Sequence, residues 1–127
     1  MSWPSETQQE QAKRYLAMKQ DELYALIPIY LPEYDGVAFA PQAQIQAGRA
    51  FFERILRGLR KAVCEDFDWP SKRNDPGFSD TVNLVAAIAD NISTYVGSVP
   101  PFLIASLLVR KGLDSLCSAY FKGNKQL

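Results

Sequence analysis

The sequence predicts an all-α protein, folded as a compact bundle of about four helices around a hydrophobic C-terminal helix. Three observations predict it. Residues 41–66 alternate apolar and charged side chains with a helical period, residues 99–121 are the most apolar part of the chain, and strand-like alternation is confined to one connector. A length of 127 residues is typical of a single domain, so we expect residues 1–127 to share one core.

The charges of the chain cancel, because it has 14 basic and 14 acidic residues. A neutral balance removes the general attraction to nucleic acid or anionic lipid that a basic protein has. Binding of either kind would therefore need a local basic patch.

The first predicted helix spans about residues 5–26. Ser5 is followed three positions later by Gln8, the spacing of a capping box. One apolar stripe runs along it: Ala12, Tyr15, Leu16, Leu23, Leu26 and Ile27. Lys19 and Gln20 interrupt this stripe, so we expect the helix to lie on the outside of the bundle.

Residues 27–41 form a connector rich in proline and aromatic residues. Its three prolines and the Asp35-Gly36 pair exclude a continuous helix. A free linker would be polar, whereas this segment is apolar, so we expect it to pack across the bundle. The alternative is a short hairpin around Asp35 and Gly36.

The longest predicted helix covers residues 41–66 and starts at Pro41, a residue suited to the first helical position. Its apolar face consists of Ile45, Phe52, Ile55, Leu56, Leu59 and Val63. Its opposite face is basic, and an exposed loop over residues 71–77 follows.

Two further helices are predicted near 80–96 and 100–121. Ser79 or Asp80 caps the first, and the connection between them is so short that they must be neighbours. Residues 102–109 are apolar except for Ser106. No side of the second helix is therefore polar enough to face water. We therefore expect this helix to be enclosed by the others.

Residues that could carry catalysis are scarce. The chain has no histidine, which removes the commonest general base and the commonest zinc ligand. Glu65, Asp66 and Asp68 are more typical of a turn than of a metal site. We expect no enzyme activity, no metal and no cofactor.

The two cysteines, Cys64 and Cys117, do not form a CxxC motif. We expect each to act as a small packing residue in a reducing compartment, although a bridge between them stays open. No signal-peptide pattern or membrane-length apolar run is visible. The sequence therefore predicts a cytoplasmic protein without a transmembrane segment.

One basic face provides candidate binding residues: Arg49, Arg54, Arg57, Arg60 and Lys61. Spacings of three and four residues place several of these cations together on the 41–66 helix. Such a face can simply be solvated, or it can bind an acidic protein, nucleic acid or anionic lipid. All three interpretations stay open, and simple solvation is the default.

Aromatic residues in predicted loops provide the second set of candidates: Trp3, Tyr30, Tyr34, Phe39, Phe67, Trp69 and Phe78. Exposed aromatic side chains are good interface anchors, and among them we single out Tyr34 and Trp69. The leading hypothesis is a protein-interaction domain, serving as an adaptor, regulator or accessory subunit and binding a protein partner or a second copy. The alternative is a nucleic-acid-binding protein that uses the basic face.

Overall fold

The computed structural model describes residues 4–124, with side chains through residue 118. These residues contain seven α-helices, shorter helical turns and no strand, which confirms the all-α prediction. The α-helices are α1 (Glu6–Leu16), α2 (Gln20–Leu26), α3 (Pro41–Arg60), α4 (Trp69–Lys72), α5 (Thr81–Ile92), α6 (Pro101–Lys111) and α7 (Leu113–Asn124). The first and last of the four predicted helices are therefore each divided into two.

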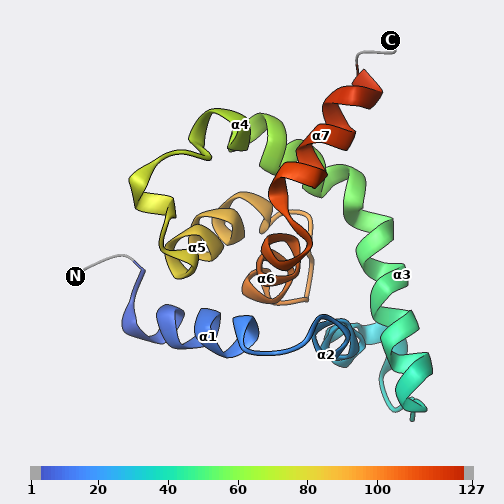
Figure 1. The fold of residues 1–127 in the computed structure, drawn as a ribbon. Helices are drawn as coiled ribbons and strands as arrows, with labels where there is room; N and C mark the ends of the chain where they lie inside the picture. Colours follow the sequence, from blue (N-terminus) through green and yellow to red (C-terminus); the bar gives the residue numbers. More distant parts are fainter. Residues whose placement is uncertain (1–3, 125–127) are drawn as a thin grey trace.

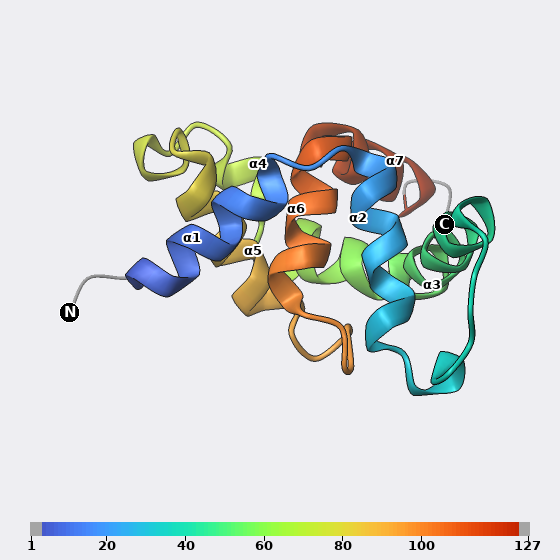
Figure 2. The same cartoon turned by 90° about the horizontal axis from the view of Figure 1, so that it is seen from below.

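Helix α6 is the centre of the fold. Figure 1 shows it almost end-on, with α5 on its left, α1 and α2 below it, and α7 above. In Figure 2 it lies between α1 and α2. All residues from Phe102 to Leu108 are buried, as the apolar run predicts. The one polar residue among them, Ser106, has a buried hydroxyl with no hydrogen-bond partner among the described residues.

The division between α6 and α7 lies at Gly112, whose φ of 101° is a conformation that other residues rarely adopt. The division between α1 and α2 lies at residues 17–19, where the Lys19 amide donates a 2.8 Å hydrogen bond to the Glu22 carboxylate. Ser5 and Gln8 form the predicted capping box at the start of α1. The prediction of unbroken helices over 5–26 and 100–121 is wrong at these two points.

Helix α3 continues into a π-helical turn, η3 (Lys61–Asp66), so the prediction of helix over 41–66 is confirmed. Phe52, Leu59 and Val63 are buried as predicted. Helix α3 packs closely on α2 at Gly48. A Cβ atom at this position would overlap the Tyr24 carbonyl group, so the close approach requires glycine.

Helix α5 begins after Asp80, whose carboxylate accepts a 2.9 Å hydrogen bond from the Val82 amide. It ends at Ile92, four residues before the predicted end. A turn then leads into α6, and the two helices pack against each other as the short connection predicts. The 3₁₀ turn η4 (Pro76–Phe78) also packs against α5, whereas α4 packs against α7.

The connector holds two 3₁₀ turns, η1 (Ile27–Tyr30) and η2 (Pro32–Tyr34). Ile27 and Leu31 are buried, so the first part of the connector packs into the core as expected. Ile29, between these two buried residues, is 62% exposed, and in the later part of the connector 50% of Val37 is exposed. The alternative hairpin is wrong, since residues 35–40 contain no strand.

Trp3, one of the predicted loop aromatic residues, lies outside the described residues, as do the side chains at positions 119–121 of the predicted 100–121 helix. Across the described part of the chain, no helix has the length and apolar character needed to cross a membrane.

Candidate binding surfaces

Two of the predicted basic residues are held in ion pairs. Arg49 Nη2 lies 2.9 Å from an Asp21 carboxylate oxygen, and Arg54 Nη2 lies 3.4 Å from Glu33 Oε1. Each guanidinium also lies over an aromatic ring, 5.3 Å from the centroid of Tyr24 for Arg49. Both pairs are exposed, so each contributes little stability but reduces the positive charge offered to a partner.

The other three predicted cations, Arg57, Arg60 and Lys61, lie in different environments. Arg57 and Lys61 are exposed, and neither forms an ion pair with any side chain described in residues 4–118. Arg60 is partly buried and lines a pocket beside α6. The five predicted residues therefore do not form one continuous, unpaired basic face.

Tyr34 and Trp69, the two predicted aromatic anchors, occupy opposite environments. Tyr34 is half-buried at the surface, where it packs edge-to-face on Phe39 with ring centroids 5.2 Å apart. Trp69 is 91% buried, and its indole N–H donates a 2.9 Å hydrogen bond to Asp114. The structure thus makes Trp69 a core residue, and the loop position suggested by sequence gave the wrong environment.

Exposed apolar side chains are concentrated in the connector. Among the described residues, the large apolar side chains that are exposed are Ile29, Tyr30 and Val37. Together with Tyr34 and Phe39 they form what we call the connector surface. A hollow of about 230 Å³ is lined by Ile29, Tyr34, Val37 and Phe39, with Gln44 and the turn at residues 35–36. The sequence indicated the apolar character of this segment but not which part stays exposed.

A second hollow, of about 490 Å³, lies between α3, α6 and the start of α7, and we call it the basic pocket. Its cations are Arg60, Arg110 and Lys111. Its apolar wall includes Phe52, Leu56, Leu108 and Leu116. The sequence pattern did not reveal this pocket, because its cations come from two helices distant in sequence.

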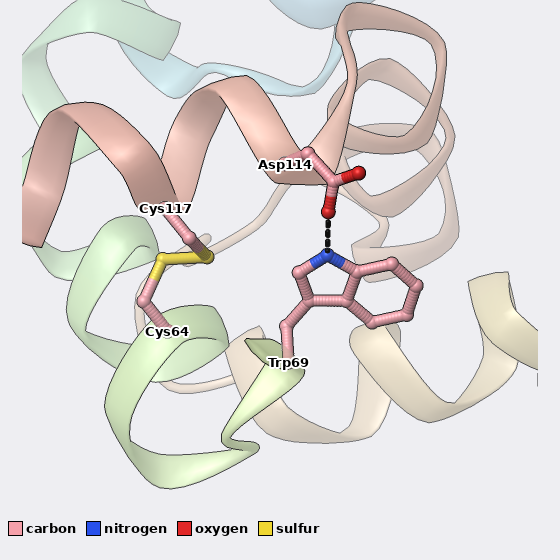
Figure 3. The surroundings of a disulfide bond; sticks show 4 residues. All are labelled: Cys64, Trp69, Asp114 and Cys117. Atoms are coloured by element: carbon pink, nitrogen blue, oxygen red, sulfur yellow. Dashed lines mark hydrogen bonds between the residues drawn. A yellow bond between two sulfur atoms is a disulfide. The ribbon is translucent and has the colours of Figure 1, made fainter. Parts of the chain in front are cut away.

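The two cysteines are joined by a disulfide, with their Cα atoms 5.4 Å apart (Figure 3). The bridge connects η3 to α7, beside the Trp69–Asp114 hydrogen bond. Both residues are buried, as predicted for packing residues. The bridge that the sequence left open is therefore present, because the π-helical turn and α7 bring the two cysteines together.

Chemically reactive groups are few in the described part of the chain. No group of three His, Cys, Asp or Glu side chains there could hold a metal ion. The pKa of Tyr15 is raised, first by burial and then by the neighbouring Tyr30 side chain. Tyr15 is a core residue of α1, so this shift concerns stability and not a reaction.

The chain matches no protein-family model, no curated protein and no solved structure. The connector surface and the basic pocket are therefore the features of this fold that bear on its function.

Proposed function

We propose that this protein works by protein–protein contact, as an adaptor, regulator or accessory subunit, and that the connector surface is its docking site. The observation that supports this proposal is the exposure of Ile29 and Val37 within one short connector. Single exposed apolar residues are ordinary on protein surfaces, whereas a cluster of them is typical of an interaction site.

The connector surface is held in shape before any partner binds. Ile27 and Leu31 anchor its first part in the core. The Ser98 hydroxyl donates a hydrogen bond to the Tyr30 carbonyl oxygen, and Gln44 Nε2 donates a 2.6 Å hydrogen bond to the Ala25 carbonyl oxygen. A pre-ordered surface loses less conformational entropy on binding, which favours affinity.

The chemistry of the connector surface describes its partner. Ile29 and Val37 favour an apolar patch on the partner, and aromatic side chains such as Tyr34 are frequent binding hot spots. The exposed carboxylate of Asp35 lies at its edge and favours a basic residue beside that patch, whereas Glu33 is already paired with Arg54. The partner is a second protein or a second copy of this chain.

The experiment compares the wild type with an Ile29→Glu/Val37→Glu variant. We expect the variant to lose a complex that the wild type forms, measured by light scattering for self-association and by affinity capture for a different partner. Asn74→Glu/Thr94→Glu is the matched control, because it adds the same charge at two exposed polar positions outside the connector. Equal association by all three proteins would refute the proposal.

Nucleic-acid binding is a weaker candidate. Arg49 and Arg54 already pair with carboxylates, which leaves Arg57 and Lys61 as the unpaired exposed cations of the predicted face. Titration with DNA and RNA at low salt tests it, because phosphate contacts are strongest there. Binding that disappears in an Arg57→Glu variant would favour this function over the first.

The same proposal holds that the protein binds its partner without catalysing a reaction. It also concerns the cellular compartment in which the protein works. A cytoplasmic location remains a prediction, and the disulfide weighs against it because the cytosol keeps most thiols reduced. Alkylation of free thiols in intact cells before lysis tests this point. Two modified cysteines would support a reducing compartment, and an unmodified, bridged pair would support an oxidising one.

A further inference from the structure

We infer that the basic pocket binds a small amphiphilic anion, in which a carboxylate or phosphate is attached to an apolar group. This inference is independent of the connector surface. The basic pocket has a volume of about 490 Å³, which lies within the range of small-molecule sites. Three cations line it, and no acidic side chain does so among the residues described.

Arg60 carries the first step of the inference. Its Nε atom is buried and has no hydrogen-bond partner among the described residues. Because this atom is closed to solvent, an anion would meet the guanidinium at its terminal nitrogens and not at Nε. Arg60 lines the pocket and forms no ion pair with a side chain described in residues 4–118. Arginine is also well suited to grip a carboxylate or phosphate with two parallel hydrogen bonds.

The other two cations are held at the rim of the pocket. Arg110 Nη1 donates a 3.0 Å hydrogen bond to the Leu16 carbonyl oxygen, which fixes the guanidinium at the end of α1. Lys111 Nζ lies 5.8 Å from the centroid of the Phe52 ring. Neither cation forms an ion pair with a side chain described in residues 4–118, so both remain available to an anion.

The apolar wall explains why the ligand needs more than a charge. Phe52 and Leu108 are buried members of the core, and Leu56 and Leu116 are partly exposed at its edge. An apolar group in contact with this wall is removed from water, which favours binding. A free inorganic anion would leave the exposed parts of Leu56 and Leu116 in contact with water.

One acidic residue lies close enough to matter. Glu53 and Arg49 share a smaller adjoining hollow with Lys111, so Lys111 faces a carboxylate on that side. Arg60 and Arg110 do not line that hollow. We therefore assign the main contacts with the anionic head group to Arg60 and Arg110.

The experiment measures binding of defined probes to the full chain by isothermal titration calorimetry, below their micelle-forming concentrations. The probes are dodecanoate, dodecyl phosphate, dodecyltrimethylammonium and acetate. We expect at least one of the two anionic amphiphiles to bind, and the tighter of them identifies the head group. Binding of the cationic amphiphile as tight as that of the anions, or of acetate as tight as that of dodecanoate, would overturn the inference.

Two variants of helix α3 provide the matched test. Arg60→Met removes the pocket's guanidinium but keeps an apolar stem, and we expect about tenfold weaker binding of the anionic probe. Arg57→Met makes the same change one turn earlier, at an exposed residue that does not line the pocket, and should leave affinity unchanged. Equal affinities of both variants, or failure of both anions to bind the wild type, would overturn the inference. Circular dichroism of each variant confirms that it is folded.

Discussion

Removal of the Cys64–Cys117 disulfide should destabilise the protein substantially. The bridge joins residues separated by 53 positions, and it connects η3 to α7. Closing a loop of that length lowers the conformational entropy of the unfolded chain, which raises its free energy by about 4 kcal/mol and so stabilises the folded protein. This is a large fraction of the roughly 5–15 kcal/mol by which a domain is typically stable.

The assay is urea denaturation followed by circular dichroism, with oxidised protein, reduced protein and a Cys64→Ala/Cys117→Ala variant. For a denaturant slope of about 2 kcal/mol per M, a loss of about 4 kcal/mol lowers the urea midpoint by about 2 M. The free energies of unfolding of the reduced protein and of the variant should agree within about 1 kcal/mol. Both lack the bridge, and they differ only in carrying two thiols or two alanine methyl groups.

A matched control separates loss of the bridge from other effects of the reductant. Reductant should lower the midpoint of the wild type and leave that of the alanine variant unchanged. Equal midpoints of oxidised and reduced wild type would refute the reasoning. So would mass spectrometry that finds two alkylated cysteines in protein purified without reductant.

Three further predictions concern the core. Leu107→Ala and Leu108→Ala should each cost about 2–5 kcal/mol in chemical denaturation, because both side chains are buried in α6, and a loss confined to one would contradict its enclosure. Gly48→Ala should lower stability by about 1–3 kcal/mol, because the new methyl group meets the Tyr24 backbone, and an increase from improved helix propensity would contradict that packing. The raised pKa of Tyr15 means that its stabilising effect is present below about pH 10 and is lost as the pH rises above that value. Tyr15→Phe should therefore reduce the alkaline fall in melting temperature. Parallel curves of melting temperature against pH for the two proteins would contradict this.

The central helices could be predicted because local pattern and burial agree there. The apolar run at residues 102–108 leaves no polar face, and the structure encloses all of it. The break at Gly112 could not be predicted in the same way, because a single glycine is tolerated within a helix. The chain turns from α6 into α7 at this glycine with a positive φ, and the glycine alone does not distinguish such a turn from an uninterrupted helix.

The candidate sites depend more strongly on tertiary structure. The pattern over residues 41–66 gathered five cations on one face, but the pairing of two of them with Asp21 and Glu33 is decided by where α2 and the connector lie. The partnership of Arg60 with Arg110 in one pocket joins residues from two helices, and no spacing in the sequence reveals it. The same holds for the disulfide, because a separation of 53 residues carries no information on distance in space.

The most direct test of the proposed function is site-specific photo-crosslinking at the connector surface. A photoreactive phenylalanine analogue replaces Ile29 in one protein and Thr94, an exposed residue outside the connector, in another. We predict a protein adduct from position 29 that is abolished by Val37→Glu in the same chain, and no adduct from position 94. Absence of an adduct at position 29, or equal adducts at both positions, would contradict a docking role for this surface.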